Sequence, residues 1–151
     1  MTGEDHTGGP LDVATLEVLA RRAETHRLVD DWAFRPDHIS PRRLELHLDD
    51  GQYPESVDAS RLDVCWYEGG EYTFHYLESR EDDTFESGED DTWQCRWDHH
   101  SKPDAPTAHF HPPPDASADV EPSDLESAHH LGILFEVLDW IEARVVEHHQ
   151  Q

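Results

Sequence analysis

Apolar residues along this chain repeat first with a helical period and then with a period of two. From residue 12 they recur every three or four positions with charged residues opposite, which predicts an amphipathic helix. Alternating apolar and polar residues then predict strands over residues 28–34, 44–48, 62–66, 72–77 and 92–98. Gly69 and Gly70 supply the positive φ angles that a tight turn needs, so the third and fourth of these runs are expected to form a hairpin.

A second amphipathic helix is predicted near the C-terminus. Its apolar face consists of Leu131, Leu134, Leu138, Ile141 and Val145. The sequence Ser-Asp-Leu-Glu at residues 123–126 is typical of a capping box and predicts a helix start there. Residues 99–122 contain six prolines and are expected to hold little regular structure. His129 and His130 are expected at the rim of this helix, and His148 and His149 in a frayed C-terminal tail.

Together these elements predict an α+β fold, in which an antiparallel sheet of four or five strands is flanked by an N-terminal and a C-terminal helix. Both helices are expected to cover one face of the sheet, leaving a polar face that includes His75. Residues 1–10 are polar and glycine-rich and are predicted to be disordered. Residues 11–147 are predicted to form a single domain.

The net charge of the chain decides whether composition can be used to infer a nucleic-acid partner. Asp and Glu total 35 residues against 11 Lys and Arg, giving a net charge of −24, and Lys102 is the only lysine. Dispersed acidity with almost no lysine is typical of a halophile's protein. In 1 M salt the Debye length falls to about 3 Å, so self-repulsion is screened. The acidity therefore indicates a salty solvent, and it neither favours nor excludes a nucleic-acid partner.

The sequence also predicts a cytoplasmic protein with no membrane contact. No stretch approaches the roughly 20 apolar residues of a membrane span, and the N-terminus lacks the basic and apolar regions of a signal peptide. Cys65 and Cys95 each lie in an aromatic, strand-like run, so they are expected to be buried free thiols. Aromatic residues in these strands alternate in phase, which favours a core over an exposed base-stacking surface.

Candidate chemistry is concentrated where basic residues interrupt the acidic background. Four of the thirteen histidines lie in one short stretch with the only lysine, and prolines flank it. An extended backbone at residues 109–111 would place both of its imidazoles on one face, with Phe110 turned into the core. The candidate site residues are His99, His100, His109, His111, Arg96, Asp98 and Lys102.

These residues support three interpretations. In the first, two of the histidines act as general base and general acid in RNA cleavage without a metal. Arg96 or Lys102 would stabilise the charge on phosphorus, and Asp98 would help to bind substrate. In the second, His99, His100, His109 and His111 bind zinc or another divalent ion, although their spacing matches no standard zinc signature. In the third, the histidines only cap strand ends through backbone carbonyls.

The runs Arg96-Trp97-Asp98-His99-His100 and His109-Phe110-His111-Pro112 resemble the TumE-type proteins of prokaryotic toxin–antitoxin pairs. Small proteins of halophilic archaea share a similar pattern. The likeness covers roughly residues 62–141, so the first sixty residues are expected to be an added portion. The resemblance implies a growth-inhibiting toxin, acting on RNA and neutralised by an antitoxin protein encoded beside it. The alternative is a non-catalytic metal-binding or protein-interaction module, and a homodimer is left open.

Overall fold

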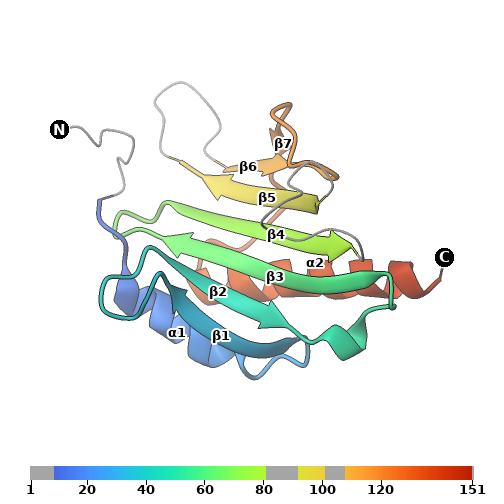
Figure 1. Cartoon of the computed structure of the whole chain (residues 1–151). Coiled ribbons are helices and arrows are strands. Elements are labelled where there is room, and N and C mark those ends of the chain that lie inside the picture. Colours follow the sequence, from blue (N-terminus) through green and yellow to red (C-terminus); the bar gives the residue numbers. More distant parts are fainter. Residues whose placement is uncertain (1–8, 81–91, 101–107, 151) are drawn as a thin grey trace.

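A computed structural model describes residues 9–80, 92–100 and 108–150. Within them, seven strands form one antiparallel sheet in sequential order, and both long helices lie on the same face of the sheet (Figure 1). The elements are α1 (Val13–Ala23), β1 (Val29–Arg35), β2 (Arg43–Leu48), the short 3₁₀ helix η1 (Asp50–Gln52), β3 (Val57–Trp66), β4 (Tyr72–Arg80), β5 (Trp93–His99), β6 (Ala108–His111), β7 (Glu121–Pro122) and α2 (His130–His149). The α+β class and the two flanking helices are confirmed, whereas the expected number of strands was too low. The prediction of disorder at residues 1–10 concerns a segment that lies largely outside the described residues.

Helix α1 forms where the sequence predicts it. Asp12 caps its first turn by accepting a hydrogen bond from the Thr15 backbone N–H at 3.0 Å. Leu16 and Leu19 are fully buried against the sheet. The helix therefore covers the sheet beside β2 and β3, as the apolar stripe predicted.

The hairpin between β3 and β4 turns where the two glycines predict it. The Gly70 N–H donates to the Tyr67 carbonyl at 2.8 Å, and Gly70 has a φ of 95°. A Cβ at this position would meet no atom within 4 Å, so only backbone strain opposes a side chain.

Gly70→Ala is therefore expected to lower the free energy of unfolding by about 1 kcal/mol, because alanine disfavours a positive φ. Gly69→Ala is the matched control, since Gly69 is not among the residues with positive φ. Urea denaturation of both variants at fixed salt measures the difference. Equal losses at the two positions would contradict this account of the turn.

Two further strands, β6 and β7, lie in the proline-rich segment that was expected to be mostly irregular. The four residues of β6 are bounded by Pro112, and they pair with β5 in register from Arg96↔His111 to His99↔Ala108. Strand β7 ends the sheet with Pro122, which lacks an N–H and is tolerated because an edge strand needs donors on one side only. The sequence indicated an extended backbone at residues 109–111 within β6, but strands this short leave too few alternating residues to predict their pairing in the sheet.

Helix α2 begins later than the capping-box sequence predicted. His129 is the N-cap residue, and its Nδ1 accepts a hydrogen bond from the Leu131 backbone N–H at 3.1 Å. The N–H groups of Glu126 and Ser127 donate instead to Glu136 Oε1, at 3.0 and 3.2 Å. Residues 123–126 therefore run beside α2 rather than starting it, and the capping-box prediction was wrong.

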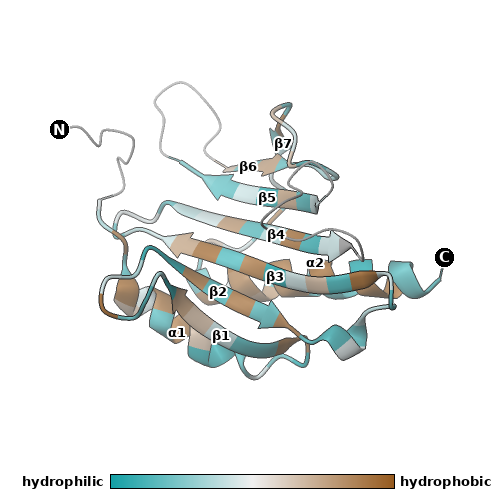
Figure 2. Cartoon of the chain, in the orientation of Figure 1, coloured by the Kyte–Doolittle hydropathy of each residue, from teal (hydrophilic) through white to brown (hydrophobic). Residues whose placement is uncertain are grey.

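The aromatic residues fill the space between the sheet and α2. Figure 2 shows apolar and polar residues alternating along the strands. Phe74, Tyr76 and Trp97 are almost completely buried, and Trp140 of α2 packs edge-on against Trp97 with ring centroids 5.1 Å apart. The prediction that these aromatics form a core is confirmed. None of the described helices is both long and apolar enough to span a membrane.

One buried ionic cluster joins β4 to the end of α2. The Glu78 carboxylate, 0% exposed, accepts hydrogen bonds from Arg144 at 3.0 and 3.1 Å and from the Tyr76 hydroxyl at 2.6 Å. His148 Nε2 lies 3.0 Å from the same carboxylate. His148 is thus held in the last turn of α2 and not in a frayed tail, which corrects the prediction from the sequence.

Candidate functional site

The face of the sheet opposite the helices carries polar side chains in cross-strand rows. Because paired residues of neighbouring strands share a face, the register Asp63↔His75, His75↔Arg96 and Arg96↔His111 places these four side chains in one row. Adjacent strands lie about 4.8 Å apart, so the row runs across β3, β4, β5 and β6. We call this surface, without covering helices, the open face.

Within the open face, Arg96, Asp98 and His111 form a compact cluster. Arg96 Nε donates to Asp98 Oδ2 at 3.0 Å, and His111 Nε2 lies 2.8 Å from the same oxygen. Arg96 Nη2 is 3.2 Å from His111 Nε2, so the carboxylate is shared by the guanidinium and the imidazole. The Asp98 residue is only 4% exposed, and its Oδ1 has no hydrogen-bond partner among the described residues. Charge-assisted contacts on a buried carboxylate of this kind hold side chains in fixed positions.

Both ring nitrogens of His111 are engaged. Its Nδ1 lies 2.9 Å from the Ser117 carbonyl, an acceptor, so this nitrogen donates. Its Nε2 lies between Arg96 Nη2, a donor 3.2 Å away, and the Asp98 carboxylate, 2.8 Å away. The ring therefore ties the segment after β6 to the cluster. It has no nitrogen left for a substrate and is suited to positioning Asp98 and Arg96.

The other three candidate histidines take different positions relative to this cluster. His109 pairs with Asp98 across β5 and β6, lies on the open face, and makes no hydrogen bond with another described residue. His100 Nε2 lies 3.9 Å from Asp98 Oδ2, at the edge of the cluster. His99 lies on the opposite face, where its ring stacks on the buried Tyr72 with centroids 5.2 Å apart.

The seventh candidate, Lys102, lies outside the described residues. Phe110 packs on the core, with its ring centroid 5.1 Å from that of Trp97, as expected from the alternation of β6. Because His99 faces the helices, the four histidines proposed as a zinc site do not converge as one set within the described part of the chain.

A second set of side chains has the residue types that bind metals, but its geometry does not favour metal binding. His26, Asp139 and Glu142 have ligand atoms within 4.8 Å of one another, the only such group among the described residues. The Leu28 backbone N–H donates to His26 Nδ1 at 3.1 Å, so the ring proton of the neutral imidazole is on Nε2. That nitrogen faces the two carboxylates at 3.7 and 3.9 Å. A protonated Nε2 cannot bind a metal, so this geometry fits a polar contact between α2 and the segment after α1 better than metal ligation.

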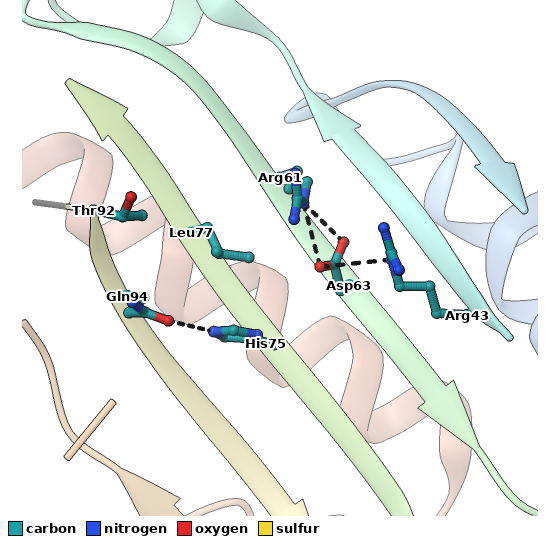
Figure 3. Close-up of a pocket in the computed structure, with 7 residues that line it drawn as sticks. All are labelled: Arg43, Arg61, Asp63, His75, Leu77, Thr92 and Gln94. Atoms are coloured by element: carbon teal, nitrogen blue, oxygen red, sulfur yellow. Dashed lines mark hydrogen bonds and ion pairs between the residues drawn. The ribbon is translucent and has the colours of Figure 1, made fainter. Parts of the chain in front are cut away.

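A pocket of about 280 Å³ opens on the open face next to the cluster (Figure 3). It is lined by Arg43, Arg61, Asp63, His75, Leu77, Thr92 and Gln94. Arg61 Nε donates to both oxygens of Asp63, at 3.1 and 3.3 Å, and Arg43 Nε lies 3.8 Å from Asp63 Oδ2. Sequence reasoning placed His75 on the polar face but did not connect it with the site, because strand register is not visible in one sequence.

Burial dominates the electrostatics of this pocket. It lowers the pKa of His75, more strongly than the hydrogen bond to Gln94 and the nearby Asp63 raise it. Burial also raises the pKa of Asp63, although Arg61 and Arg43 oppose this effect. A neutral imidazole beside arginines is an arrangement suited to moving a proton near a bound anion.

The fold and this surface define an α+β protein with an open sheet face that combines arginine, carboxylate and imidazole groups. A family model described as Toxin TumE matches residues 16–145. The chain belongs to the TumE toxin family. The match begins within α1, so the first two strands are part of the family's domain and the expected added N-terminal portion was wrong. Neither the curated proteins nor the solved structures give a significant match.

Proposed function

We propose that this protein is the toxin of a toxin–antitoxin pair and that it cleaves RNA at the open face without a metal ion. Membership of the TumE toxin family supports the toxin role. The observation that carries the chemistry is the grouping of Arg96, Asp98, His109 and His111 on one face of β5 and β6. An antitoxin partner follows from the same family, and the neighbouring gene is where it is expected.

Each of these residues suits a different role in phosphodiester cleavage. The Arg96 side chain is 35% exposed, so it can contact a phosphate while its Nε stays bound to Asp98. A guanidinium there would stabilise the charge that develops on the phosphoryl oxygens. His111 and Asp98 would hold that arginine in place. His109, with its uncommitted ring, would protonate the leaving oxygen.

His109→Ala is expected to reduce the rate of RNA cleavage at least about 10²-fold, the usual contribution of a general acid. It is also expected to relieve growth inhibition when the protein is induced in a host. His38→Ala is the matched control, because His38 is exposed and distant in sequence from the cluster. The assay follows a labelled single-stranded RNA in molar potassium chloride, because the charge of −24 predicts a need for screening.

The assay is run with and without EDTA, so that it also tests the metal alternative. Cleavage that persists in EDTA and falls in His109→Ala supports the proposal. Intact RNA with the wild-type protein, or equal rates for His109→Ala and His38→Ala, would contradict it. Loss of cleavage in EDTA with a stoichiometric metal in the untreated protein would favour the metal-binding interpretation instead.

A further inference from the structure

His75 lies where a second proton-transfer group is needed. It is the cross-strand partner of Arg96 on β4, whereas His109 lies on β6, on the other side of β5. With strands about 4.8 Å apart, β4 and β6 are separated by roughly 10 Å and Arg96 lies between them. His109 pairs with Asp98, two residues along β5 from Arg96, so a phosphate bound to Arg96 would have His75 on the β4 side and His109 diagonally across on the β6 side.

The hydrogen bond to Gln94 fixes which nitrogen of His75 is available. His75 Nε2 lies 2.7 Å from the Gln94 amide oxygen, which only accepts, so Nε2 carries the proton of the neutral ring. Nδ1 then holds a lone pair. In Figure 3 the ring edge opposite Gln94 faces the side of β3 from which Arg61 and Asp63 rise. The lone pair is thus on the pocket side of the ring.

The surroundings of the ring favour a neutral base that is able to accept a proton. Burial lowers the pKa of His75, which favours the unprotonated ring. The charged groups around it are Asp63, which favours the protonated ring, and Arg96 and Arg61, which disfavour it. Asp63 would therefore stabilise the imidazolium once a proton arrives.

We propose that His75 is the general base of the reaction and that the adjoining pocket binds the ribose whose 2′-hydroxyl attacks. This inference rests on the proposed function and deepens it. Nδ1 takes the proton of the 2′-hydroxyl as that oxygen forms a bond to phosphorus. The bond from phosphorus to the 5′-oxygen of the next nucleotide breaks, and His109 protonates that oxygen. The products are a 2′,3′-cyclic phosphate and a 5′-hydroxyl, and proton exchange with water returns both histidines to their starting states.

The test compares His75→Ala and His75→Gln with His47→Ala, a histidine on the same face two strands away on β2. Both His75 variants are expected to cleave RNA at least about 10²-fold more slowly than wild type, and His47→Ala within a few-fold of it. Binding of an RNA with a 2′-deoxy nucleotide at the cleavage position is expected to change by only a few-fold. Added imidazole is expected to restore part of the activity of His75→Ala.

The pH profile separates a base from a structural residue. Because the pKa of His75 is lowered, kcat/KM of the wild type should rise with pH through a value below 6.5. That acidic limb should disappear in the His75 variants. If wild-type protein cleaves RNA but the His75 variants retain full activity or the acidic limb, the inference is wrong and the proposed function stands. If wild-type protein leaves RNA intact, the proposed function fails and the inference fails with it.

Discussion

Replacing Arg144 by leucine is expected to lower the free energy of unfolding by about 3–5 kcal/mol, which is the usual cost of removing one partner from a buried ion pair. The Glu78 carboxylate is completely buried and receives two hydrogen bonds from Arg144. Without the guanidinium it would remain charged in the core with only Tyr76 and His148 as partners. Arg144 also lies 3.5 Å above the Trp93 ring, so this contact is lost as well.

Urea denaturation at fixed salt measures this change, with Arg21→Leu as the control. Arg21 forms an i,i+4 pair with Glu17 and its side chain is 67% exposed, so the control should change stability by less than about 0.5 kcal/mol. The double variant Glu78→Leu with Arg144→Leu should recover much of the loss, because no charge is left buried. A double variant less stable than Arg144→Leu alone would show that the loss comes from packing instead.

Protonation of Glu78 in the same cluster should lower the free energy of unfolding at acidic pH. Burial alone raises the pKa of Glu78, but hydrogen bonds from Arg144, Tyr76 and His148 outweigh it and leave the pKa below 4.5. The folded state therefore binds fewer protons than the unfolded state at low pH. The stabilisation is complete above the unfolded pKa and is lost as pH falls through the folded value.

Arg96→Ala is expected to reduce RNA cleavage by about 10²- to 10³-fold, the range found when a single donor to a developing oxyanion is removed. Its fold should persist, because Trp97, the next residue in β5, holds the strand to the core from the other face. Arg96→Lys should not restore the rate, since an ammonium cannot bind Asp98 and a phosphate with the same fork of donors.

Arg35→Ala is the matched control for Arg96, because Arg35 lies on the edge strand β1 and bonds Glu45 at 3.1 Å. Steady-state rates on labelled RNA, together with circular dichroism spectra of each variant, measure the outcome. Equal rates for the two arginine variants would remove Arg96 from the site.

Local patterns predicted those parts of the fold that depend on local physics. Helix α1 and strands β2 to β5 each bury an apolar face, and β1 partly buries one, so apolar residues repeat with a period of 3.6 or 2 in the sequence. Strand β6 has only four residues and β7 only two, so the alternation at residues 109–111 indicated an extended backbone there but not a sheet strand, and β7 left no period to detect. The helix start was missed because Ser123 and Glu126 have the right types and spacing for a capping box, while Glu136 takes the backbone donors of Glu126 and Ser127.

The candidate site was predictable in part for a related reason. Arg96 and Asp98 are two residues apart on a strand, and so are His109 and His111, so each pair shares a face. The alternation of β5 also places His99 on the other face. Which strand lies beside which, and in what register, depends on pairings between distant segments. His75 and Asp63 could not be joined to Arg96 without that register.

The two edges of the sheet have a consequence for association between chains. An exposed strand edge can pair with another chain, and surface charge is one common protection against this. Charge repulsion weakens as salt shortens its range. Here β1 carries a register shift between Val29 and Asp31, and β7 is a two-residue strand that contains Pro122. A distorted backbone and a missing N–H obstruct strand addition equally well at any ionic strength, so resistance to edge-to-edge aggregation should not depend on the net charge.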